Sequence, residues 1–189
     1  MRRTGQLLAG IALLGGCSGE PLATEAISHM QARAMVASGT SRPGDNKELA
    51  ALRRVTAPLH NFENAAAAGW SAQITACMAG ADGGMGFHYG NPALIDGSVR
   101  ADEPELLLYE PEENGRMRLV AVEYIIPYTL RSRSATPPVL FGQEFKQNDA
   151  FQLWALHAWV WKDNPRGLFA DWNPLVTCEH TNAVSTMAH

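Results

Sequence analysis

Apolar side chains recur every three or four residues in two early parts of the chain, a spacing typical of helices with one buried face. The first part is Thr24 to Ala37, where Thr24 is a candidate N-cap. The second runs from Asn46 to Ala68, and within it Pro58 either kinks the helix or begins a new one. The pattern therefore predicts an N-terminal helical region that ends at Gly69.

After Gly69 the pattern changes to short apolar runs separated by turn residues, which is typical of strands. The clearest pair is Leu106 to Glu110 and Met117 to Ile126, because the Asn114-Gly115 dipeptide between them favours a hairpin turn. Helices followed by strands predict an α+β fold, in which the N-terminal helices pack on a curved, mainly antiparallel β-sheet. Further strands are predicted at Ser71 to Met78, Phe151 to Trp161 and Leu175 to Cys178.

The remaining segments are predicted to be loops or tails. Ala79 to Gly86 is glycine-rich and Arg131 to Pro138 is polar and contains proline, so both are expected to be surface loops. The expected domain organisation is a signal peptide at residues 1–16, a tether at 17–23, one globular domain at 24–180 and a disordered tail at 181–189.

The first seventeen residues predict export. Two arginines precede the apolar run Leu7 to Leu14, and Gly15 and Gly16 stand directly before Cys17. This order resembles the lipobox of bacterial lipoproteins. The resemblance implies that the chain is cut before Cys17, which then carries acyl chains such as palmitate. It also implies a membrane anchor in the cell envelope, and Ser18 after the cysteine favours the periplasmic face of the outer membrane. The alternative is an ordinary signal peptide with a chance cysteine.

Charge and cysteine content narrow the picture. Removing the signal removes two arginines and no acidic residue, so the net charge of −4 becomes −6 and no nucleic-acid partner is expected. In an oxidising compartment Cys77 and Cys178 are expected to form a disulfide. A metal or redox pair is the alternative, although the chain lacks a C-x-x-C motif.

The alternation of strand faces brings forward three polar residues. His157 is expected to share a face with Trp159 and Trp161, and His88 follows the glycine-rich segment. Glu123 stands in an apolar strand and is expected to share a face with Leu119, Ala121 and Ile125. We therefore expect a ligand pocket at His88, His157 and Glu123, with Tyr89, Tyr124 and Trp159 as its walls.

Three interpretations fit these residues, two of them chemical and one structural. Two imidazoles and a carboxylate suit a divalent metal ion such as zinc, although the spacing matches no metal motif. Without a metal, the histidines could act as general acid and base. In the third interpretation His157 is a core histidine and Glu123 pairs with Arg118 or Arg131. The chain contains no G-x-S-x-G motif, so acyl-transfer chemistry is not expected. Asp163 and Asp171 are expected to close turns.

Four stretches carry a resemblance to a group of uncharacterised secreted bacterial proteins. They are G-M-G-F-H-Y at residues 84–89, P-E-L-L-L-Y-E at 104–110, L-V-A-V-E-Y at 119–124 and L-H-A-W-V-W-K-D-N-P at 156–165. The similarity runs from about Ala65 to Cys178 and implies domain limits and export, but no activity.

The sequence as a whole predicts a lipid-anchored periplasmic domain that binds a metal ion or a small molecule at His88 and His157. The alternative is a non-catalytic envelope protein that docks a partner through a tryptophan-rich surface. Nothing in the sequence identifies a reaction.

Overall fold

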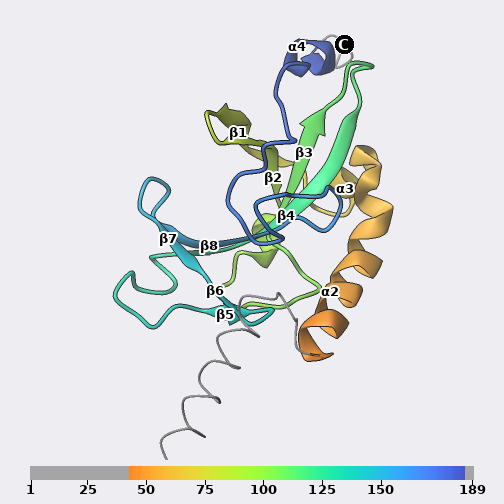
Figure 1. The fold of residues 1–189 in the computed structure, drawn as a ribbon. Helices are drawn as coiled ribbons and strands as arrows, with labels where there is room; N and C mark the ends of the chain where they lie inside the picture. Colours follow the sequence, from red (N-terminus) through yellow and green to blue (C-terminus); the bar gives the residue numbers. More distant parts are fainter. Residues whose placement is uncertain (1–42, 186–189) are drawn as a thin grey trace, which may run out of the picture. The chain divides into compact units, whose positions relative to one another are not determined.

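The computed structural model describes the backbone of residues 43–185 and the side chains of residues 46–183 (Figure 1). The predicted signal peptide, the tether and the helix at Thr24 to Ala37 lie outside these described residues. No helix in the described part of the chain is both long and apolar enough to cross a membrane.

Three short helical elements form the start of the described chain: α2 (Pro43–Thr56), η1 (Ala57–His60) and α3 (Phe62–Ala67). Pro58 lies at the start of η1, where its missing N–H leaves no helical hydrogen bond unmade. Asn61 caps α3, because its side chain accepts hydrogen bonds from the N–H groups of Glu63 and Asn64. The helical region therefore forms, as three elements, and ends at Gly69, which has a φ of 114°.

Six strands form one sheet of order β1-β2-β3-β4-β8-β7, in which every neighbouring pair is antiparallel. A two-stranded ribbon and two further short helices complete the described fold. The predicted α+β class, with helices packed on a curled antiparallel sheet, is confirmed. The bounds are β1 (Ala72–Gly80), β2 (Gly83–Gly90), β3 (Leu106–Pro111), β4 (Met117–Pro127), β5 (Val139–Leu140), β6 (Gln143–Glu144), β7 (Lys146–Asn148), β8 (Leu153–Ala158), η2 (Pro92–Leu94) and α4 (Thr181–Ser185).

The two faces of the sheet support two separate cores. The helices cover one face (Figure 1), where Leu52 of α2 and Ala65 of α3 pack with Tyr109, Tyr124 and other residues of the strands. The opposite face has a smaller core, whose buried members are Met85, Leu106, Leu108, Val120, Ala121, Ile125, Trp159 and Val176. The smaller core is the side on which the candidate site lies.

The glycine-rich segment 79–86 is not the loop that its composition predicted. Its two halves belong to β1 and β2, which pair directly as a hairpin. The glycines are needed because other backbone passes very close: a Cβ at Gly86 would lie 2.3 Å from the carbonyl oxygen of Tyr109, and one at Gly83 would lie 2.3 Å from that of Asn173.

The C-terminal segment, residues 171–178, crosses the sheet without forming the strand predicted at Leu175 to Cys178. Asn173 and Gly84 exchange both backbone hydrogen bonds as an isolated bridge. Further along, the N–H of Thr177 donates to the buried carboxylate of Glu110, which also accepts from Lys162 Nζ. The short helix α4 follows in place of the tail expected from residue 181, and residues 186–189 lie outside the described part.

A disulfide joins Cys77 of β1 to Cys178 at the end of this segment. The two cysteines are 101 residues apart in sequence, with their Cα atoms 5.8 Å apart, a separation usual for a disulfide. The bond holds the edge strand β1 to the C-terminal segment.

Candidate metal centre

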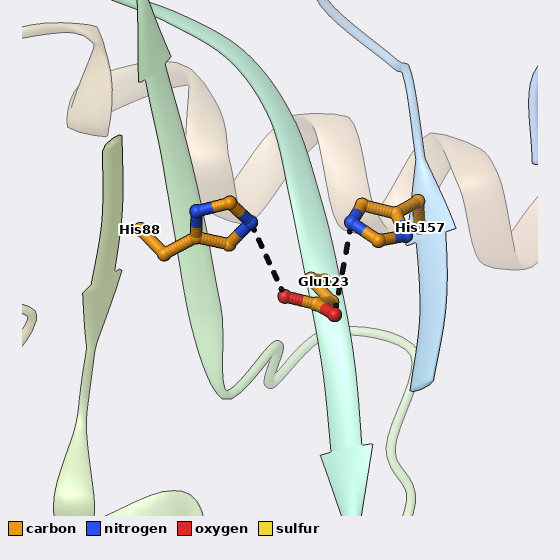
Figure 2. A group of neighbouring side chains, drawn as sticks. All are labelled: His88, Glu123 and His157. Atoms are coloured by element: carbon orange, nitrogen blue, oxygen red, sulfur yellow. Dashed lines mark ion pairs between the residues drawn. The ribbon is translucent and has the colours of Figure 1, made fainter. Parts of the chain in front are cut away.

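Three buried polar side chains from three different strands converge on one point. His88 comes from β2, Glu123 from β4 and His157 from β8, and one donor atom of each lies within 4.8 Å of the others. Figure 2 shows the Glu123 carboxylate between the two imidazoles, both of which point toward it. Its Oε2 lies 3.6 Å from His88 Nε2, and its Oε1 lies 3.6 Å from His157 Nε2.

The register of the sheet accounts for this convergence. Glu123 and His157 are directly opposite each other on β4 and β8, so their side chains leave the sheet on the same face. His88 lies one strand further away, on the other side of β3, where it is opposite Leu108. The imidazole reaches the carboxylate across β3 because the sheet curls toward this face.

A cavity of about 390 Å³ opens over the three side chains. Both edge strands line it, β1 through residues that include Thr75 and β7 through residues that include Lys146. Most of the exposed cavity surface is apolar, and its polar lining comes from Thr75, the two histidines, Glu123, Asp171 and the segment Lys146 to Asp149. An apolar cavity with a few convergent polar groups is the usual form of a small-ligand site.

Burial sets the charge state of the three groups. It lowers the pKa of His88 to about 3, with a further contribution from His157, and lowers the pKa of His157 to about 4, with help from the positive charge of Lys146. Burial also raises the pKa of Glu123 to about 8, and the neighbouring carboxyl groups of Asp171 and Glu105 act in the same direction. In the metal-free protein at pH 7 the imidazoles are therefore neutral and the carboxyl group is protonated.

Each histidine has a polar side chain near Nδ1, the ring nitrogen that does not face Glu123. Thr75 Oγ1 lies 2.8 Å from His88 Nδ1, a hydrogen bond that leaves Nε2 directed at Glu123. Asp171 Oδ1 lies 3.9 Å from His157 Nδ1. Such outer partners orient metal-binding histidines and fix which nitrogen carries the proton. Neither Thr75 nor Asp171 is among the site residues that the sequence predicts.

The two nitrogens of His157 have no hydrogen-bond partner in the described structure, although both are buried. A buried imidazole without partners is costly, since its N–H and its lone pair are both cut off from water. A ligand on Nε2 would satisfy the lone pair. His157 therefore lines the cavity with both ring nitrogens unpaired, as expected for a metal-binding histidine in the absence of its metal.

The spacing of the three donor groups fits a metal ion better than it fits direct hydrogen bonding. The two nitrogen–oxygen distances of 3.6 Å exceed the range of a hydrogen bond. In a tetrahedral zinc site with bonds of 2.0–2.1 Å, two donor atoms lie about 3.3–3.4 Å apart. The two histidine–glutamate distances are within a few tenths of an ångström of this value, and binding an ion would also draw together the more widely spaced donor atoms, which lie within 4.8 Å of one another.

The predicted walls of the pocket are in a different place. Tyr89 follows His88 and Tyr124 follows Glu123, so both tyrosines point to the opposite face and pack in the helix-covered core. Trp159 does lie on the side of His157, with the two rings nearly parallel, but it packs behind the imidazole and does not line the cavity. The expectation that these three residues form the walls is therefore not met; the walls include Ile74, Met78, Met85, Leu106, Ile125, Leu153 and Trp172.

Two neighbours expected on the site face also lie elsewhere. A β-bulge interrupts the pairing of β3 with β4 between Leu108 and Tyr109, and it moves Leu119 into the helix-covered core. The strand β8 ends at Ala158, and Trp161 turns to the helical side, where its indole N–H donates to Thr56. Strand alternation fails at both points because the regular pairing stops.

The described part of the structure does not show the features expected for two alternatives, an arginine partner for Glu123 and an exposed tryptophan-rich surface. Among the described residues, the basic side chains that come within 4 Å of the Glu123 carboxyl group are the two histidines, and not Arg118 or Arg131. Arg131 instead donates to the carbonyl oxygen of Thr136. All five tryptophans of the chain lie within the described residues, and each is buried or half-buried, so they form no exposed patch.

Comparison with family models, with curated proteins and with solved structures finds no match to this chain. The function is therefore inferred from the geometry and the chemistry of the site itself.

Proposed function

We propose that the protein binds one divalent metal ion, with zinc as the first candidate, through His88 Nε2, His157 Nε2 and the Glu123 carboxylate. The observation that carries the proposal is the convergence of two neutral imidazoles and one carboxyl group in a buried site, where none of the three is hydrogen-bonded to another. Metal binding requires neutral histidines and a deprotonated carboxylate, so the incoming ion has only the Glu123 proton to displace.

The proposed donor set leaves at least one coordination position open. Three protein ligands are typical of catalytic zinc sites, whereas structural zinc sites usually have four. The same two-histidine, one-carboxylate set also suits non-haem iron. A bound ion would supply Lewis acidity at the open position, which faces the cavity. His88 and His157 would hold the ion, Glu123 would neutralise one of its charges, and Thr75 would orient His88.

We also propose that the protein is a lipoprotein of the cell envelope, anchored through Cys17. The support is the lipobox-like sequence at residues 14–17, together with the disulfide, since disulfides persist in exported proteins. In this proposal the metal site belongs to a periplasmic domain, and its ligands come from the periplasm.

The test of the metal site is the stoichiometry of Zn²⁺ and Co²⁺ binding to the purified full-length protein, measured by calorimetry. We expect one ion per chain, and a Co²⁺ absorption spectrum that indicates nitrogen and oxygen ligands. His88→Ala, Glu123→Gln and His157→Ala should each lose the ion. His60→Ala is the matched control, because His60 contacts Trp161 away from the cavity and should leave the binding unchanged. Failure of the unsubstituted protein to bind either ion would overturn the proposal.

A further inference from the structure

The net charge of the proposed metal centre determines the charge of the ligand that its open position accepts. A divalent ion with one carboxylate and two neutral histidines has a net charge of +1. The other charged side chains that line the cavity already have partners: Lys146 pairs with Asp171, and Asp149 pairs with Arg133. The metal centre would be the one uncompensated charge among the lining residues, and it would lie in a largely apolar space where an unpaired charge is costly. A monoanionic ligand compensates this charge.

The polarity and the volume of the cavity indicate the nature of the rest of the ligand. Apart from Thr75 and the polar segment Lys146 to Asp149 its walls are mostly apolar, and they include Met78 and Met85, whose flexible side chains adapt to the shape of a ligand. The volume of about 390 Å³ lies at the small end of the range for cavities that hold organic ligands.

The exposed part of the cavity lining includes large apolar side chains beside the polar residues Lys146, Gln147 and Asp149. Ile74 of β1 and Phe151, just before β8, both line the cavity, and they are 45% and 48% exposed. Here they extend the apolar wall from the floor of the cavity to its edge.

From these observations we infer that the site takes a small apolar monoanion, such as a medium-chain or aromatic carboxylate, whose oxygens occupy the open position of the metal ion. The apolar body of the ligand lies against Met78, Met85 and Ile125 and extends toward Ile74 at the mouth. The inference rests on the proposed metal site, because without the ion the cavity has no unpaired positive charge to attract a carboxylate: Lys146 already pairs with Asp171.

The test uses the purified full-length protein loaded with Co²⁺, whose absorption spectrum reports a change of ligand at the metal. Acetate, hexanoate and hexanamide are titrated in turn. Hexanoate should bind at least tenfold more tightly than acetate, since each buried methylene contributes up to about fourfold in affinity. Hexanamide, which has the same apolar body and no charge, should bind at least tenfold more weakly than hexanoate.

A pair of matched variants tests the direction of the apolar body. Ile74→Asn at the mouth should weaken hexanoate binding severalfold and leave acetate unchanged. Val139→Asn is the control: Val139 is also an exposed β-branched residue of a strand, and it does not line the cavity. An Ile74 variant that binds hexanoate as well as the control does would overturn the proposed course of the ligand.

The outcomes separate this inference from the proposed function. If Co²⁺ binds but acetate and hexanoate bind equally, or hexanamide equals hexanoate, the ligand class is wrong while the metal site stands. Binding of neither carboxylate would mean that hydroxide alone balances the charge, and it would overturn the inference in the same way. If Co²⁺ does not bind at all, the proposed function fails, and the inference fails with it.

Discussion

The hydroxyl oxygen of Thr75 lies 2.8 Å from Nδ1 of His88, so a residue of the edge strand β1 determines how a histidine of β2 presents its other nitrogen. In the proposed centre this bond keeps the proton on Nδ1 and the lone pair of Nε2 on the metal. The contact joins two neighbouring strands at a point where their pairing is irregular, because Thr75 and His88 flank register shifts.

Thr75→Val should weaken zinc binding by about tenfold, the lower end of the effect of removing such an outer partner. Valine has nearly the shape of threonine but cannot hydrogen-bond to Nδ1. Thr75→Ser keeps a hydroxyl group and should restore most of the affinity. Calorimetry on the three proteins measures the difference, and equal affinities would show that the Thr75 hydroxyl does not position His88.

His157→Leu should separate the effect of the buried imidazole on metal-free stability from its role in zinc binding. Without metal, the variant should be at least as stable to urea as the unsubstituted protein, because it removes a buried imidazole with two unpartnered nitrogens. Free zinc at 100 times its Kd should stabilise the unsubstituted protein by about 2.7 kcal/mol and the variant not at all. His60→Leu, outside the cavity, should keep the zinc response. A large loss of metal-free stability in His157→Leu would identify His157 as a packing residue instead.

Glu105 should make the protein less stable as the pH rises. Burial raises the pKa of its carboxyl group to about 8, above the ordinary value of 4.5 that applies in the unfolded chain. Between these two values the folded protein keeps a proton that the unfolded chain has lost, so the free energy of unfolding falls with rising pH. The loss begins near pH 4.5 and is complete above pH 8, and its size is on the order of a few kcal/mol.

Glu105→Gln should remove this part of the pH dependence. A glutamine oxygen can still accept the hydrogen bond that Glu105 Oε2 receives from the N–H of Ile125, and it has no proton to lose. Urea unfolding at pH 5 and pH 8.5 in the presence of a chelator measures the change. The exposed Glu144→Gln is the control and should keep the pH slope of the unsubstituted protein. An unchanged slope in Glu105→Gln would contradict the prediction.

Loss of the disulfide should destabilise the protein without abolishing its fold. The bond closes a loop of 101 residues, for which chain entropy gives at most about 4.7 kcal/mol. The double variant Cys77→Ser/Cys178→Ser should therefore melt at a measurably lower temperature, and adding a reductant should lower the melting temperature of the unsubstituted protein but not that of the variant. Equal melting temperatures before and after reduction would show that the bond contributes nothing.

Cys17→Ser should release the protein from membranes. Fractionation of cells should place the unsubstituted protein with the membranes, and mass spectrometry should find acyl chains on Cys17. The double variant of Cys77 and Cys178 is the control and should remain anchored, because only the thiol of Cys17 follows the lipobox-like residues. A mature chain that starts at a residue other than Cys17 would contradict the lipoprotein proposal.

Strand alternation in the sequence selects Glu123 and His157, and His88 is selected because it follows a glycine-rich segment. The same rule excludes Tyr89 and Tyr124, which directly follow two of these residues and must point the other way. Leu119 cannot be placed correctly from the sequence, since a bulge leaves no mark in the pattern of apolar residues.

Thr75 and Asp171 escape sequence-based prediction for a different reason. Thr75 meets His88 through the register of a hairpin whose glycine-rich composition indicates a long loop instead. Asp171 approaches His157 from a segment that returns across the sheet without regular strand structure. Contacts of this kind depend on the tertiary path of the chain, and local sequence patterns do not encode that path.

The crossing of the C-terminal segment over β2 also sets an order of assembly. During synthesis or export from the N-terminus, the strands that carry all three proposed metal ligands are present before Asn173 reaches Gly84 and before Cys178 can meet Cys77. Until then β1 lacks its covalent tie, and Gly83 and Gly84 of β2 lack the backbone that passes close to them. The domain is thus completed by the last part to appear, so a chain halted a few residues short of Cys178 would contain every proposed ligand but not the disulfide that ties β1, and with it Thr75, to the C-terminal segment.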